Sequence, residues 1–222
     1  MLHLDFQRRG DEFPEVGVEQ TSNLVAAAWH GWVGEIERHC KAGGITTEDR
    51  DWAVYLAVQQ NRPDALVALV DKCPDINIPA RRIPGEDHGP VLDHGPLWTA
   101  ATKGFHLMAK VLLQAGADPN RARASGGETP IAMASQSGFA DTVAMLLQAG
   151  ADPNRVRPED GATPIYQASE NGHTATVEVL LRNGANPNVA TTDGRDYTPL
   201  KIANQKRHAE VVALLCAAGA KQ

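Results

Sequence analysis

Apolar residues along the chain are spaced in a way that predicts short helices in pairs. In the clearest stretch, Ile165 and Ala168 form the narrow apolar face of one helix, and Val177 and Leu180 form the apolar face of a second. The polar sequence Asn-Pro-Asn at residues 186–188 then turns the chain outward. This pattern predicts a unit of two helices followed by a projecting loop, which is called a finger below.

Capping residues mark the ends of both helices in this unit. Thr163 is a preferred N-cap residue, and Pro164 suits the first helical turn, where the backbone N–H needs no partner. Gly172 and Gly184 follow the two helices and end them. A single unit cannot bury its apolar faces alone, so neighbouring units are expected to stack on one another.

The same unit occurs several times in the chain. The sequence Leu-Leu-Gln-Ala-Gly-Ala-Asp-Pro-Asn-Arg is found at residues 112–121 and again, unchanged, at 146–155, and a close variant occupies residues 180–188. A second block, Thr-Pro-Ile or Thr-Pro-Leu, recurs at a matching interval, at residues 129–131, 163–165 and 198–200. Internal repeats of this length are typical of solenoid proteins, in which each unit contacts only its neighbours.

These two blocks resemble the ankyrin repeat, which has a period of about 33 residues. The shared pattern is T-P-[IL]-x-x-A-x-x-x-G-[HF] followed by L-L-x-x-G-A-[DN]-P-N, and three copies are nearly intact. The resemblance extends through weaker copies over about nine-tenths of the chain. It implies an all-α fold, a solenoid of stacked helix–turn–helix units with short β-hairpin-like fingers.

About six repeats are expected within residues 21–222, after an N-terminal tail or short helix at residues 1–20. The expected repeats are 21–46, 47–78, 95–123, 124–157, 158–190 and 193–222. Residues 79–94 are rich in Pro and Gly and are expected to form a long loop between two repeats. Residues 47–49, Thr-Glu-Asp, are expected to cap the first helix of the second repeat.

Composition and charge narrow the classes of function. The formal net charge of −6 lacks the basic excess of a nucleic-acid-binding protein. The chain has no apolar run near the roughly 18 residues that a membrane span needs. Its first residues are charged where a signal peptide is apolar. Three cysteines without the spacing of a disulfide framework favour a reducing compartment, so we expect the protein in the cytoplasm or the nucleus. We also expect a monomer that binds neither nucleic acid nor membranes.

Candidate catalytic groups are few. Cys40 and Cys216 stand at leucine positions of their repeats, which predicts that both are buried packing residues. Cys73 has Lys72 beside it, but a nucleophilic cysteine needs a basic partner placed by the fold, and the sequence indicates none. The chain has no phosphate-binding loop, dinucleotide motif or zinc motif, so we expect no enzyme activity, no metal and no cofactor.

Two features near the long loop have alternative interpretations. The loop contains Asp87, His88, Asp93 and His94, whose carboxylates and imidazoles suit a divalent metal or an atypical enzyme site; the other interpretation is a solvated loop. Asn77 resembles finger asparagines that an asparagine hydroxylase modifies, and the other interpretation is an asparagine that stabilises its loop.

The resemblance also locates a candidate binding surface. In ankyrin proteins the fingers and the inner face of the first helices form the concave side that is used for recognition. Trp and Tyr are favoured anchors in interfaces. The other interpretation of these rings is that they pack against a neighbouring finger. Arginines in the long loop add charge-assisted contacts. The candidate partner-binding residues are Trp29, Tyr55, Gln59, Arg81, Arg82, Trp98, Thr102, Lys103 and Tyr166. We therefore expect a protein-interaction module or adaptor with an unidentified protein partner; a regulatory or inhibitory subunit is the alternative.

Overall fold

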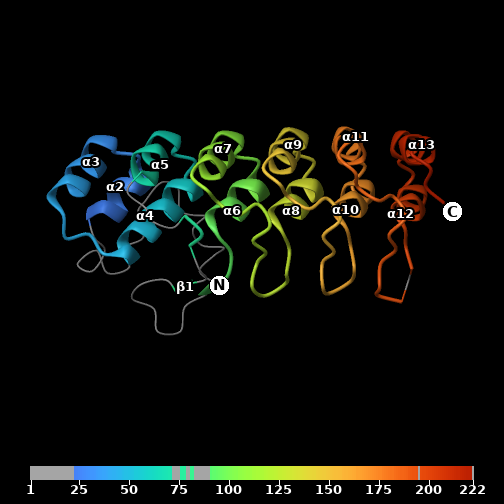
Figure 1. The fold of residues 1–222 in the computed structure, drawn as a ribbon, viewed down its shortest axis with the longest axis horizontal. Helices are drawn as coiled ribbons and strands as arrows, with labels where there is room; N and C mark the ends of the chain where they lie inside the picture. The colour runs from blue at the N-terminus through green and yellow to red at the C-terminus, as the bar shows by residue number, and fades with distance from the viewer. Residues whose placement is uncertain (1–22, 72–75, 79–80, 83–90, 195, 222) are drawn as a thin grey trace. The chain divides into compact units, whose positions relative to one another are not determined.

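The computed structural model describes residues 23–71, 76–78, 81–82, 91–194 and 196–221, and this part of the chain contains twelve helices (Figure 1). The helices form six pairs, which confirms the predicted all-α repeat architecture. The first helices of the pairs are α2 (Asn23–His30), α4 (Thr47–Gln59), α6 (Pro96–Lys103), α8 (Pro130–Gln136), α10 (Pro164–Glu170) and α12 (Pro199–Lys206). The second helices are α3 (Val33–Ala42), α5 (Pro63–Val70), α7 (His106–Gln114), α9 (Ala140–Gln148), α11 (Thr174–Arg182) and α13 (Ala209–Ala217). The N-terminal segment 1–20 lies outside the described residues.

The chain divides into two units by its contacts. The N-terminal unit contains helices α2 to α5 and two short strands, β1 (Arg81–Arg82) and β2 (Val91–Leu92). The strands pair antiparallel, with Arg81 opposite Leu92, so the stretch expected to be a loop contains a short hairpin ladder. The C-terminal unit contains residues 76–78 and helices α6 to α13.

Threonine side chains start three of the first helices, as the Thr-Pro blocks predict. Thr129, Thr163 and Thr198 each accept a hydrogen bond at their hydroxyl from the backbone N–H three residues later, at 3.2–3.3 Å. Gly95 takes this position before α6 and has no side chain with which to cap it. The cap of α4 lies one residue earlier than expected: Thr46 and Asp49 form a reciprocal capping box, and Thr47 is already helical.

The core of the C-terminal unit is a double row of small and aliphatic side chains. First helices pack against the first helices of adjacent repeats, and second helices pack against second helices, which Figure 1 shows as two parallel rows. Leu112, Leu146, Leu180 and Leu215 are fully buried at equivalent positions of the second helices. Each repeat therefore completes the core of its neighbours, as the stacking argument requires.

Adjacent repeats also interlock at the turn between their two helices. The rings of Phe139, His173 and His208 lie over a glycine of the preceding repeat, and a Cβ at Gly138 would stand 2.6 Å from the His173 ring. His173 Nε2 lies 3.0 Å from the carbonyl of Gln136, and His208 Nε2 lies 3.1 Å from that of Glu170. These two histidines therefore have a structural role, since their rings link adjacent repeats.

A row of asparagine side chains links each finger to the next repeat. Asn77 Nδ2 donates to the Gly116 carbonyl at 3.3 Å, and its Oδ1 accepts from the Asp118 N–H at 2.7 Å. Asn120 and Asn154 make the same two bonds to the repeats that follow them. The structure thus favours the loop-stabilising interpretation of Asn77, because its amide is used as a repeat-to-repeat link.

One buried amide breaks the rule that buried polar groups are paired, and it leads to a stability prediction. The Gln167 side chain on α10 is 3% exposed, and neither its Oε1 nor its Nε2 has a hydrogen-bond partner among the described residues. Met133 and Ile202 stand at the equivalent positions of the adjacent repeats. Because an unpaired buried amide is destabilising, we expect Gln167→Met to raise the free energy of unfolding by about 1–2 kcal/mol.

Urea unfolding followed by circular dichroism would measure this gain. Gln205→Met, on the exposed end of α12, is a suitable control and should change stability little. A loss of stability in Gln167→Met would contradict the prediction, because the amide would then make a favourable interaction that methionine lacks.

Candidate functional site

The indole ring of Trp98, in the first turn of α6, is held between two side chains. The His94 ring lies 4.3 Å from it, centroid to centroid, and the Arg123 guanidinium carbon lies 5.7 Å from the ring centre, a cation–π distance. His94 precedes α6, whereas Arg123 comes from the next finger, so two chain segments fix one ring. The ring stays partly exposed.

Asp93 holds these two neighbours in place. Arg123 Nε donates to both carboxylate oxygens at 2.9 Å, and His94 Nδ1 lies 3.2 Å from Oδ1. Burial alone would raise the pKa of Asp93, but hydrogen bonds from Ser125, Arg123 and His94 lower this pKa far below its usual range. The Asp93 carbonyl also accepts from the Ala124 N–H at 2.8 Å, which joins the two segments through the backbone. Trp98 is therefore preorganised by a charged network.

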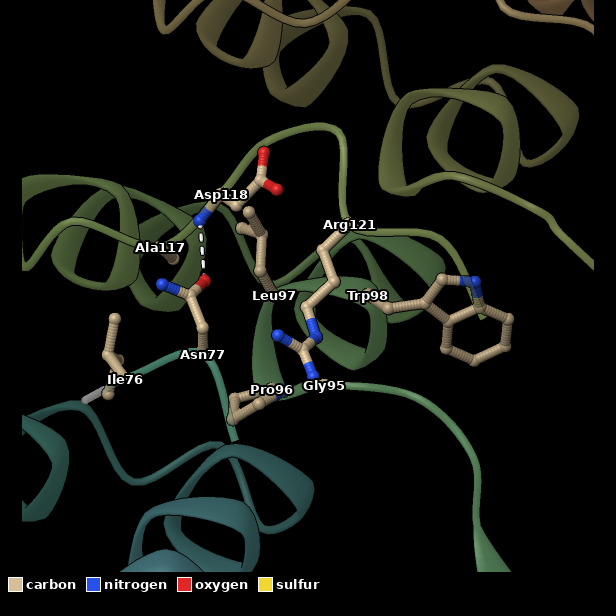
Figure 2. Close-up of a pocket in the computed structure, with 9 residues that line it drawn as sticks. All are labelled: Ile76, Asn77, Gly95, Pro96, Leu97, Trp98, Ala117, Asp118 and Arg121. Atoms are coloured by element: carbon tan, nitrogen blue, oxygen red, sulfur yellow. Dashed lines mark hydrogen bonds between the residues drawn. The ribbon is translucent and has the colours of Figure 1, made fainter. Parts of the chain in front are cut away.

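A shallow hollow lies beside Trp98 at the start of α6 (Figure 2). Figure 2 shows Arg121 extending from its finger toward Gly95, and the Trp98 ring pointing away from Asn77. The hollow has room for about one water molecule, far less than the hundreds of cubic ångströms of a small-molecule site. This volume is too small to enclose a substrate.

The C-terminal end of α6 adds two of the predicted contact residues. The Thr102 hydroxyl donates to the Trp98 carbonyl at 2.9 Å, so part of its hydrogen-bonding capacity is used within the helix. The Lys103 side chain is exposed, and its ammonium nitrogen lies 5.7 Å from the centre of the Phe105 ring. Although the side chain is exposed as a whole, nearby protein atoms partly desolvate the ammonium group and lower the pKa of Lys103. Trp98, Thr102 and Lys103 thus lie on one helix.

Two predicted contact tyrosines are mainly packing residues. Tyr55 is 6% exposed and packs with Val25 and Trp52, and its hydroxyl accepts a hydrogen bond from the Gln59 amide. Tyr166 is 8% exposed and packs with Ala162 and Ile202. For both rings the structure favours the packing interpretation over the contact interpretation, because repeat stacking already covers them.

The remaining predicted residues belong to the N-terminal unit. Trp29 is partly exposed at the end of α2, and its carbonyl accepts from Arg62 Nε at 3.4 Å. Gln59 is also partly exposed, at the end of α4. The backbone of Arg81 and Arg82 forms β1, and their side chains lie outside the described part of the structure.

Only some of the candidate metal ligands and cysteines lie in the described part of the structure, and one cysteine differs from its expectation. Asp93 and His94 belong to the Trp98 network, while Asp87 and His88 lie outside the described residues. No cluster of three or more potential metal ligands occurs in the described part of the chain. The prediction that Cys216 is buried is wrong, since this side chain is exposed; Cys40 is partly exposed. Cys73 lies outside the described residues.

The network around Trp98 was not predicted as a unit. The sequence indicates Asp93, His94 and Trp98 for separate reasons and gives no indication of Arg123. The available signal was weak: Arg123 recurs as Arg157, which instead pairs with Asp160 of its own finger, with its Nε 2.8 Å from Oδ1. One repeat position therefore uses two different carboxylate partners, which a repeat alignment does not reveal.

Among the described residues, no helix has both the length and the apolar character needed to cross a lipid bilayer.

Comparisons with known proteins agree with the geometry described above. A sequence model of ankyrin repeats, three copies in length, matches residues 54–157 and also residues 150–222. Among the curated proteins, no relative matches the chain. The crystal structure of an ankyrin repeat domain from Acinetobacter baumannii AYE is similar, with a TM-score of 0.75 and 28% sequence identity over 89% of this chain and 98% of that one. This chain belongs to the ankyrin repeat family.

Proposed function

We propose that the chain binds a protein partner on the first helices and fingers of its C-terminal unit, with Trp98 as the central anchor. Ankyrin repeats are generally protein–protein interaction modules, and the family is typically non-enzymatic. The proposal assigns this general role to one surface. It makes the chain an adaptor-like binding module whose specificity depends on side chains displayed by rigid helices.

The observation that carries this proposal is the fixed and partly exposed ring of Trp98. An interface concentrates its binding energy in a few aromatic or arginine anchors. A ring already held by His94 and Arg123 loses little conformational entropy when a partner covers it. Trp98 therefore has the size, the exposure and the rigidity of an anchor.

The surface around this anchor is polar and suits the rim of an interface. Lys103 on α6, Gln136 on α8, Asn171 after α10 and Lys206 on α12 are exposed at equivalent ends of the first helices. Such residues exclude water from a central contact and tune specificity, while contributing little binding energy individually. Helix-to-helix packing fixes their spacing before a partner arrives.

Replacing the anchor tests the proposal. We expect Trp98→Ala to weaken binding of the natural partner by about 2 kcal/mol or more, because it removes the largest exposed ring of this unit's first helices. The partner would be captured from extracts of the source cells with the wild-type chain. Its affinity for purified variants would then be measured by calorimetry.

Two controls separate contact from folding. Lys110→Ala changes an exposed residue of α7, in the second row of helices, and should leave binding unchanged. Circular dichroism must show that Trp98→Ala is folded at the assay temperature. If a folded Trp98→Ala protein binds the partner with wild-type affinity, Trp98 is not the anchor and this surface is not the binding site.

A further inference from the structure

Two arginines occupy equivalent positions on adjacent fingers and have no acidic partner among the residues that the structure describes. Arg121 and Arg155 end the two identical ten-residue blocks, 34 positions apart. Both side chains are exposed, and neither forms an ion pair with any described residue. Other arginines of the same unit are paired: Arg123 with Asp93, Arg157 with Asp160 and Arg182 with Glu178. These two adjacent fingers thus expose two guanidinium groups that are accessible to a carboxylate of another molecule.

We propose that Arg121 and Arg155 bind an extended acidic segment of the partner protein. This inference rests on the proposed function and adds the chemistry of the partner to it. Guanidinium groups recognise carboxylates through paired, charge-assisted hydrogen bonds, and a flexible surface segment rich in Asp and Glu is the protein element that supplies them. The chain's net charge of −6 repels an acidic segment at long range. Recognition therefore depends on the positive charge of these two fingers.

The spacing of the fingers specifies the pattern of the acidic segment. The axes of packed helices lie about 8–10 Å apart. Adjacent fingers have the same spacing, because each finger belongs to one repeat. An extended chain advances about 3.3 Å per residue, so acidic residues three positions apart would reach the two arginines. The partner motif is therefore a carboxylate, two intervening residues and a second carboxylate.

The neighbouring side chains support a binding role for this row. Asp118 and Asp152 lie in the same fingers, but each accepts a hydrogen bond at 2.8 Å from a backbone N–H two residues later and stays within its own turn. Val156, next to Arg155, is 43% exposed and offers an apolar contact beside that charge. In the third finger Val189 follows Asn188 where arginine follows Asn120 and Asn154, so the row ends after two residues.

The row also lies close to the proposed anchor. Figure 2 shows the Arg121 side chain reaching across the hollow toward Gly95, at the start of the helix that carries Trp98. A partner segment bound at Arg121 would thus run beside the Trp98 surface. This arrangement predicts that the acidic motif and an apolar anchor residue occur close together in the partner.

A labelled peptide with glutamate at every third position, separated by serine and glycine, tests the inference by fluorescence anisotropy. We expect the full chain to bind it, with an affinity that falls as salt is added. Arg121→Gln/Arg155→Gln should weaken binding about tenfold or more, and a lysine version of the peptide should not bind. Arg182→Gln removes the same charge from the outer face of α11 and should leave binding unchanged.

Each other result would overturn the inference. Wild-type affinity in the double variant would show that the row does not bind carboxylates, and an equal loss in Arg182→Gln would show only a net-charge effect. The proposed function is judged separately, with the captured partner and Trp98→Ala. A partner that still binds the double variant but not Trp98→Ala would refute the acidic segment and leave the proposed function standing.

Discussion

Gly138→Ala is expected to lower the free energy of unfolding by about 3–4 kcal/mol. Gly138 has φ = +79°, a region where an alanine costs about 1–2 kcal/mol. The new Cβ would also lie 2.6 Å from His173 Nδ1 and 2.8 Å from two carbon atoms of the same ring. The ring must move, and its 3.0 Å contact with the Gln136 carbonyl would be lost or lengthened. Overpacking of this kind costs about 1–3 kcal/mol in addition to the backbone strain.

Gly150→Ala is the matched control for this effect. Gly150 belongs to the same repeat and has φ = +92°, but a Cβ there meets no atom within 4 Å. It should therefore show the backbone strain alone, about 1–2 kcal/mol. Urea unfolding of both variants isolates the contribution of the interlock between repeats. Equal losses in the two variants would show that the His173 ring moves aside freely and does not link the repeats.

Leu146→Ala should have a comparable effect, about 3–4 kcal/mol, for a different reason. Leu146 on α9 is fully buried between neighbouring second helices. Truncation removes apolar contacts and leaves a cavity that helices held on both sides cannot readily close. Thermal and urea unfolding would measure the loss, and hydrogen exchange would show whether it extends to α7 and α11.

The adjacent residue provides the comparison for this variant. Leu147 is chemically identical and one position further along α9, but it is partly exposed. Leu147→Ala should therefore cost roughly 1 kcal/mol, since less apolar area is buried there. Similar losses at both positions would contradict the assigned orientation of α9 and with it the two-row core.

The repeat architecture was predictable because it depends on local rules applied several times. Thr163, Pro164 and Gly172 specify where a helix begins and ends, and these signals need only neighbouring residues. Thr46 shows the limit of such rules: two adjacent threonines both suit an N-cap, and the reciprocal bonds with Asp49 decide between them. A register error of one residue is expected where the local signals are equal.

The candidate site was less predictable because it depends on contacts between different repeats. Asp93 and Arg123 are 30 residues apart, and their pairing requires one finger to lie beside the next in a defined register. The equivalent Arg157 uses Asp160 instead, so the repeat pattern does not determine the partner. Burial of Tyr166 likewise depends on Ile202 in the following repeat. Sequence periodicity predicts a candidate surface, whereas inter-repeat contacts determine which side chains remain available on it.

The asparagine links have an evolutionary consequence. Asn120 bonds to Gly150 and Asp152 as Asn154 bonds to Gly184 and Asn186, so successive junctions between repeats are chemically interchangeable. Recombination between the two identical ten-residue blocks would delete or duplicate one whole repeat and bring a familiar pair of surfaces together at the new junction. Such a gene would encode a shorter or longer array in which the asparagine bonds at the new junction are preserved. The asparagine link therefore sets no limit of its own on the number of repeats in the array.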